Sequence, residues 1–147
     1  MPTSSKPNNC RASKCGKISL LVWNYCHYTD EAASDSRFIQ KAVGTQRLYD
    51  MFVLQPDKQF TLTLLGLERK VRVQTTKFDR EHGSVLDAWL NMNAPEQILR
   101  EDLDVLRQKM ELEMNVEYHS PAPDVLTLNV TVQPHRVTLV DISESAF

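Results

Sequence analysis

The chain has 147 residues, of which 41% are hydrophobic and 24% are charged, and its formal net charge is −2. This length and composition are typical of one globular domain with its own core, and they exclude a disordered tail. The near-neutral charge gives no basic surface for nucleic acid or an anionic membrane, and no apolar run approaches the roughly 20 residues that a membrane span needs. We therefore expect neither nucleic acid nor a membrane as a partner.

The N-terminal residues 1–16 are rich in Pro, Ser, Asn and Lys, which predicts an unstructured leader or the remnant of an upstream connection. They contain no apolar stretch typical of a secretory signal. Cys10, Cys15 and Cys26 are odd in number and clustered, which makes a poor disulfide framework and favours a reducing, cytoplasmic location. Their spacing from one another and from His27 is not that of a zinc site, so no metal ion is expected.

The first strand signal is the apolar run Ile18–Tyr25, which shows little alternation and predicts a strand buried on both faces with Trp23 in the core. The acidic stretch Thr29–Ser36 follows, and its small residues predict a loop. The carboxylates of this loop are Asp30, Glu31 and Asp35. They lack the glycine-punctuated spacing of a calcium loop, which favours a solvated loop over a cation site.

Two further strands are predicted before the middle of the chain. Arg47–Leu54 is a weaker strand candidate. In Phe60–Leu64 apolar residues alternate with threonine, which predicts a strand with one apolar face and one wet face. Gly66 lies just beyond, and Val71–Val73 resumes the alternation. These last two segments therefore predict a β-hairpin.

The period then changes to that of helices. Ser84 can cap a first helix, with Asp87 three residues later as its capping-box partner. Trp89 lies on the apolar face of that helix, where it could stack on a sugar, although filling the groove between helix and sheet is favoured. A second helix is predicted by apolar residues spaced four, three and four apart, the pattern of a helix lying on a core. These residues are Leu99, Leu103, Leu106 and Met110.

The C-terminal part returns to period two. Leu126–Val132 alternates apolar and polar residues, Gln133–His135 is a turn, and Val137–Leu139 opens a last strand, which predicts a second hairpin. We therefore predict a mainly β fold, an antiparallel β-sandwich over residues 17–147. A two-helix insertion at about 84–114 is expected to pack on one flank of this sandwich.

Several short motifs resemble the C-terminal β-domain of family 39 glycoside hydrolases, the β-xylosidase-like enzymes. The resemblance covers Leu20–Ile142 and depends on the order and spacing of the motifs, since none is specific by itself. The motifs are Trp23-Asn24-Tyr25, Asp30-Glu31, Gly66-Leu67, Asp79, His82, Trp89, Met92, Pro95 and Gln133-Pro134-His135. In that family a β-sandwich packs beside a catalytic (β/α)8 barrel, so the resemblance implies an accessory domain.

The catalytic part of that family is missing from this sequence. The family's two catalytic glutamates stand on barrel strands, and the acid/base glutamate follows an asparagine, but the chain contains no Asn-Glu dipeptide. Eight βα units need about 250 residues, and strands and helices do not alternate in that way here. We therefore expect no catalytic residue and no cofactor, and contact with carbohydrate only through a parent glycosidase. The chain itself is expected to be a gene fragment or a truncated reading frame.

Two alternatives remain open. Modules similar to this one also occur behind AraC-type regulatory domains, so the chain could be the sensing or interaction module of a transcriptional regulator. His82 could orient a loop at the interface with the barrel, or, as is favoured, bind a backbone carbonyl between strand and helix. Scattered Ser, His and Asp residues give no triad pattern.

Loss of the barrel is expected to leave an open strand edge and an apolar patch at Ile18–Val22, and so to cause self-association.

Overall fold

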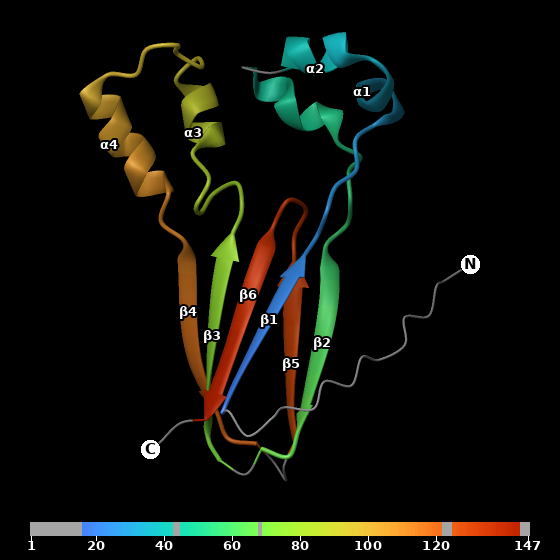
Figure 1. Cartoon of the computed structure of the whole chain (residues 1–147), viewed down its shortest axis with the longest axis vertical. Helices are drawn as coiled ribbons and strands as arrows, with labels where there is room; N and C mark the ends of the chain where they lie inside the picture. Colours follow the sequence, from blue (N-terminus) through green and yellow to red (C-terminus); the bar gives the residue numbers. More distant parts are fainter. Residues whose placement is uncertain (1–15, 43–44, 68, 122–124, 145–147) are drawn as a thin grey trace.

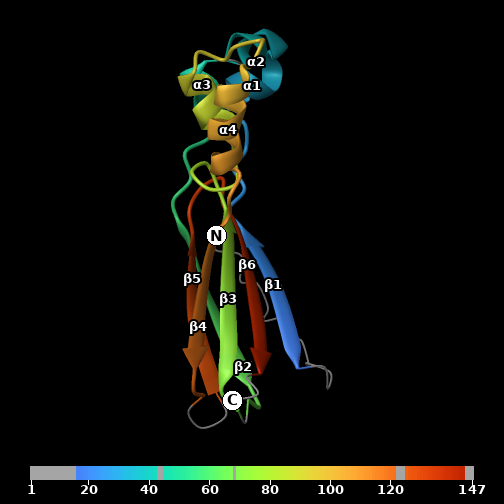
Figure 2. The same cartoon turned by 90° about the vertical axis from the view of Figure 1, so that its left-hand side faces the viewer.

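The computed structural model describes residues 16–42, 45–67, 69–121 and 125–144. Within them, six strands form two antiparallel sheets that face each other, and the helices gather beyond one end of the sheets (Figure 1). The predicted mainly β, antiparallel sandwich with a helical insertion is confirmed. The helices extend the long axis of the molecule, so the predicted position on one flank of the sandwich is wrong (Figure 2).

The two sheets differ in size. The strands are β1 (Lys17–Trp23), β2 (Lys58–Leu65), β3 (Val71–Phe78), β4 (Glu113–His119), β5 (Val125–Val132) and β6 (Val137–Glu144). The larger sheet has the strand order β1-β6-β3-β4, and the smaller sheet pairs β2 with β5. β4 was not predicted, although Met114, Val116 and Tyr118 alternate with polar residues, because the helical insertion was expected to extend to about residue 114.

Both predicted hairpins are wrong. β2 and β3 follow each other along the chain but lie in different sheets, and so do β5 and β6. Instead β2 pairs with β5, which sets Leu62 opposite Leu128, and β6 lies between β1 and β3. The alternation of apolar residues assigns each strand an inner face but does not choose its neighbour, because a chain that crosses to the opposite sheet buries the same side chains.

The main core lies between the sheets. Its buried members are Val71, Val73, Leu126, Val140 and Ile142. β1 is an edge strand that adds Ile18 and Leu20 to this core, while its other face is exposed: Leu21 is 53% exposed and Trp23 is 55% exposed. The predictions of a strand buried on both faces and of Trp23 in the core are therefore wrong, because an apolar run does not show whether its second face is covered.

One helical group stands above the ends of β1 and β2. It consists of α1 (Asp30–Ser34), α2 (Ser36–Ala42) and the 3₁₀ helix η1 (Gln46–Met51). Thr29 Oγ1 accepts the N–H of Ala32, and Thr45 Oγ1 accepts that of Arg47, so a threonine caps α1 and η1. The predicted loop at Thr29–Ser36 and the predicted strand at Arg47–Leu54 are wrong because these caps start helices.

The second helical group contains α3 (Leu86–Asn91) and α4 (Arg100–Lys109), which confirms the predicted helical insertion. The insertion ends earlier than predicted, because β4 already begins at Glu113. The capping box is wrong: Ser84 Oγ accepts the N–H of Leu86 at 3.4 Å, but Asp87 binds Arg80.

The apolar stripe of α4 does not lie on a core. Leu106 is buried, whereas Leu99, Leu103 and Met110 are exposed. The helix therefore has the amphipathic pattern of a packed helix, but most of that face meets no other described element. No helix within the described ranges is long and apolar enough to cross a membrane.

Asn24 closes the sandwich at the end nearest the helices. Its side chain is buried, and its Nδ2 donates to the carbonyl oxygens of Pro56 at 2.9 Å and Val132 at 3.2 Å. Its backbone N–H and C=O bind Arg136 and His135 in the turn between β5 and β6. The Asn of the Trp-Asn-Tyr motif thus joins three segments that are far apart in the sequence.

Candidate functional site

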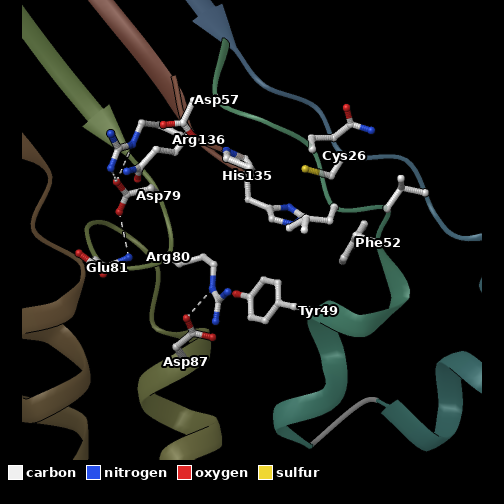
Figure 3. A pocket seen from close by; sticks show the side chains of 15 residues that line it. Cys26, Tyr49, Phe52, Asp57, Asp79, Arg80, Glu81, Asp87, His135 and Arg136 are labelled. Carbon is white, nitrogen blue, oxygen red and sulfur yellow. Dashed lines mark hydrogen bonds and ion pairs between the residues drawn. The ribbon is translucent and has the colours of Figure 1, made fainter. Parts of the chain in front are cut away.

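A cleft of about 500 Å³ lies between the end of the sheets and the two helical groups (Figure 3). It is lined by three segments, 49–57, 79–87 and 133–136, together with Cys26. This volume is in the range of small-molecule sites, so the cleft is the first place to look for chemistry.

Asp79, at the end of β3, organises one side of the cleft. Its Oδ1 accepts the backbone N–H groups of Glu81 and His82, each at 2.9 Å, and faces His82 Nδ1 at 3.1 Å. Its Oδ2 accepts Nε and Nη2 of Arg136, at 2.8 Å and 2.6 Å. Asp79 is only 6% exposed. Burial by itself raises the pKa of this carboxyl, but the hydrogen bonds from Glu81, His82 and Arg136 outweigh burial and hold the pKa of Asp79 below its ordinary value.

Arg80 connects the two helical groups across the cleft. Its guanidinium lies 3.4 Å from the centroid of the Tyr49 ring in η1, and its Nε donates to Asp87 Oδ2 in α3 at 2.8 Å. Burial, followed by the charge of Asp87, raises the pKa of Tyr49. The pKa of Arg80 is also raised, because its hydrogen bond to Asp87 outweighs burial. A cation held between an aromatic ring and a carboxylate favours a fixed junction.

His135 occupies the turn between β5 and β6 with a left-handed φ of 60°. Its ring meets Phe52 at a centroid distance of 4.7 Å and Tyr49 at 5.4 Å, in both cases edge to face. Phe52 in turn stacks on Tyr28 at 5.0 Å. Burial, and then the nearby charge of Arg80, lowers the pKa of His135, so its imidazole is neutral at pH 7.

The geometry of the cleft is that of a structural junction more than of a reaction centre. A glycosidase acid needs a raised pKa, but the pKa of Asp79 is lowered. Asp87 is held by Arg80, and Cys26 is buried with its Sγ 3.9 Å from the carbonyl oxygen of Asn24. Among the described residues, no group of three or more His, Cys, Asp or Glu side chains could hold a metal ion.

The structure places two of the motif residues, His82 and Trp89, beside partners that the sequence did not predict. His82 binds the carboxylate of Asp79 and lies 3.7 Å from Glu113, so the predicted partner, a backbone carbonyl, is wrong. Trp89 is partly buried, and its Nε1 donates to the carbonyl oxygen of Pro95 at 3.1 Å. It therefore closes the α3 turn.

The remaining candidates do not converge on the cleft. Asp30 and Glu31 lie in the first turn of α1, as the helix dipole prefers, and Asp35 binds Arg37 on the surface. Cys10 and Cys15 lie outside the described residues. The sequence prediction missed Arg80, Tyr49 and Arg136, because a cation that meets its partner through the fold leaves no local pattern.

Comparison with solved structures finds the same fold in two bacterial enzymes. A GH39 enzyme from Xanthomonas axonopodis pv. citri matches 91% of this chain with a TM-score of 0.67 and 19% sequence identity. A monomeric β-xylosidase from Caulobacter crescentus CB15 matches 92% of it with a TM-score of 0.61 and 13% identity. The chain spans about a quarter of each of those proteins, 25% and 26%.

At these identities the likeness establishes the fold, which is the one that the resemblance to family 39 glycoside hydrolases implies. No protein-family model matches the sequence, and no curated protein matches it either.

Proposed function

We propose that this chain is the non-catalytic C-terminal β-domain of a family 39-type, β-xylosidase-like glycosidase. The observation that carries the proposal is the likeness to the Xanthomonas GH39 enzyme, which extends over 91% of this chain but only 25% of that one. A quarter-length match means that the shared fold is one part of a larger protein.

The surface supports the same proposal. α4 exposes Leu99, Leu103 and Met110, and the segment after η1 exposes Leu54 almost completely, at 92%. Apolar side chains in this number are typical of a domain that packs against another part of its protein. The cleft supports it in a second way, because Asp87 and Asp79 neutralise Arg80 and Arg136 and are not free to act on a sugar.

The decisive test is the reading of the genomic DNA upstream of Met1. We expect a barrel-encoding region, in frame or interrupted, with an Asn-Glu motif. The reconstructed full-length protein should hydrolyse an aryl β-xyloside, and this chain alone should not. A control preparation from an empty vector excludes host enzymes.

Two outcomes would contradict the proposal. One is hydrolysis by the purified chain alone that is absent from the control preparation. The other is a helix-turn-helix coding region upstream, which would favour a module of an AraC-type regulator.

A further inference from the structure

The outer face of the larger sheet carries a second apolar surface, separate from the cleft and from α4. It is made of six exposed side chains, which we name the outer patch: Leu21 and Trp23 of β1, Phe78 of β3, and Met114, Val116 and Tyr118 of β4. Their exposed fractions run from 42% for Val116 to 66% for Met114. Val137 and Leu139 of β6 lie between them on the same face, so the patch crosses all four strands.

The smaller sheet shows what a solvated outer face of this protein looks like. Its outward residues are mostly polar: Gln59, Thr61, Thr63, Thr127, Asn129 and Thr131. Thr61 Oγ1 donates to Asn129 Oδ1 at 3.0 Å, so they form a cross-strand polar pair. The two sheets share one core, but their outer faces differ: the exposed large apolar side chains described on the smaller sheet are Leu65 and Val125, which pair at one end, whereas the larger sheet has the six of the outer patch.

The outer patch has the size of a binding surface. Side chains of these types at these exposures present about 100 Å² each, so the patch presents roughly 600 Å². That is at the upper limit for the largest patch of a monomer, and with its rim it approaches the roughly 800 Å² that one partner buries in a standard complex.

Electrostatics permit a second copy of the chain on this patch. The polar corner of the same face contains Lys17, whose Nζ lies 3.6 Å from Asp141 Oδ2, and Arg72, whose Nη2 donates to Gln74 at 2.8 Å. Because this corner holds both positive and negative side chains, two copies that face each other do not meet as two surfaces of the same charge. The net charge of the whole chain, −2, is also too small to keep copies apart.

The position of the patch selects one symmetric arrangement. Val116 and Tyr118 lie beside the polar residues Gln74 and Arg72. The two apolar rows lie toward the helical end of the sheet: one contains Trp23, Val137 and Phe78, and the other contains Leu21, Leu139, Thr76 and Met114. A two-fold axis parallel to the strands stacks these rows on each other, whereas an axis across the strands would place them on the polar corner. The parallel axis sets β1 of one copy over β4 of the other.

We infer that two copies of this chain pack their outer patches face to face, with Leu21 of each copy against Met114 of the other. Leu21 and Met114 lie in one row of the sheet, with Leu139 and Thr76 between them, so the two-fold axis sets them opposite each other, and a leucine against a thioether is a favourable apolar contact. This interface belongs to the chain as it stands and does not depend on the proposed glycosidase parent.

Sedimentation velocity over a concentration series tests the inference. We expect reversible dimerisation of the unmodified chain with a dissociation constant on the order of 10 µM. Leu21→Lys and Met114→Lys should each weaken it tenfold or more. Leu65→Lys is the matched control: Leu65 is an exposed leucine, 73%, on the outer side of the smaller sheet, so its replacement should leave dimerisation unchanged. Circular dichroism and melting curves establish that each variant is folded.

A benzophenone amino acid at position 23 tests the geometry independently. After irradiation of a mixture of isotopically light and heavy chains, we expect mixed cross-links to residues 113–119. A chain that stays monomeric to about 100 µM would overturn the inference. It would also be overturned if Leu65→Lys weakened association as much as Leu21→Lys, or if the cross-links fell on the smaller sheet.

Discussion

Replacement of Asp79 is the sharpest test of what joins the turn after β3 to the turn between β5 and β6. Asp79→Ala removes the acceptor of two backbone N–H groups and leaves the guanidinium of Arg136, whose side chain is only 14% exposed, without its carboxylate. Removal of one partner of a buried, hydrogen-bonded ion pair typically costs about 3–5 kcal/mol. In a protein of this size the corresponding fall in Tm is roughly 10 °C.

The assay is urea unfolding followed by tryptophan fluorescence and circular dichroism. Asp35→Ala is the matched control, because Asp35 also accepts an arginine, Arg37, but on the surface, where a pair contributes less than about 1 kcal/mol. A loss for Asp79→Ala no larger than that of Asp35→Ala would refute the assigned role of Asp79.

The lowered pKa of Asp79 also predicts how the stability of the chain falls at low pH. The pKa of Asp79 is lower in the folded chain than in the unfolded chain, so its contribution is complete above the ordinary aspartate pKa of about 4. It is lost as the pH falls from there through the folded value. Asp79→Asn should therefore lower stability at pH 7 and flatten its fall below about pH 4. If the stability of Asp79→Asn falls below about pH 4 as steeply as that of the unmodified chain, this prediction is wrong.

Four further predictions concern the junction, its surroundings and Gly66. Because burial and Arg80 lower the pKa of His135, stability should also fall as the pH drops below about 6.5, and His135→Gln should remove that part of the titration. Gly83→Ala should cost about 1–3 kcal/mol, because φ is 84° and an added Cβ would lie 2.5 Å from Phe78 Cδ2. Gly66→Ala, with φ of 75° but open space, should cost only the backbone strain, about 1 kcal/mol, in the same urea assay. Trp89→Ala should cost about 2–4 kcal/mol of stability, and calorimetry with xylose or xylobiose should show no loss of sugar binding.

How far the sequence predicts the fold depends on the range of each interaction. The alternation in Phe60–Leu64 and Leu126–Val132 arises from neighbouring residues, so these strands are found correctly. Strand pairing depends on loop paths and on the opposite sheet, and the hairpin predictions therefore failed. Thr29 and Thr45 gave a local signal for helix caps that the acidic and apolar composition around them obscured.

The candidate site shows the same limit more strongly. Asp79 and His82 were found because they are three residues apart and belong to one motif. Arg136, which neutralises Asp79, is 57 residues away, and Tyr49 meets Arg80 only because η1 and the turn after β3 stand at the same end of the sandwich. The sequence shows that a charged residue is present, but it does not show which residue pairs with it in the fold.

The junction and the outer patch should contribute to stability independently. The largest fully buried side chains of the described residues are Val71, Val132, Val140, Asn24 and Thr138, and none of these is aromatic. The fully buried positions are thus occupied by small and medium-sized side chains. Dimerisation stabilises the folded state by mass action, so Tm should rise with protein concentration.

Leu21→Lys should abolish that rise without changing the Tm of the dilute monomer, and Asp79→Ala should lower Tm at every concentration and keep the rise. Leu21 and Asp79 share no described contact, so in dilute solution the double variant should lose the sum of the two single losses, within about 0.5 kcal/mol. A double variant that departs further from the sum would mean that the outer patch and the junction form one cooperative unit, and that Leu21→Lys acts by weakening the fold instead of an interface.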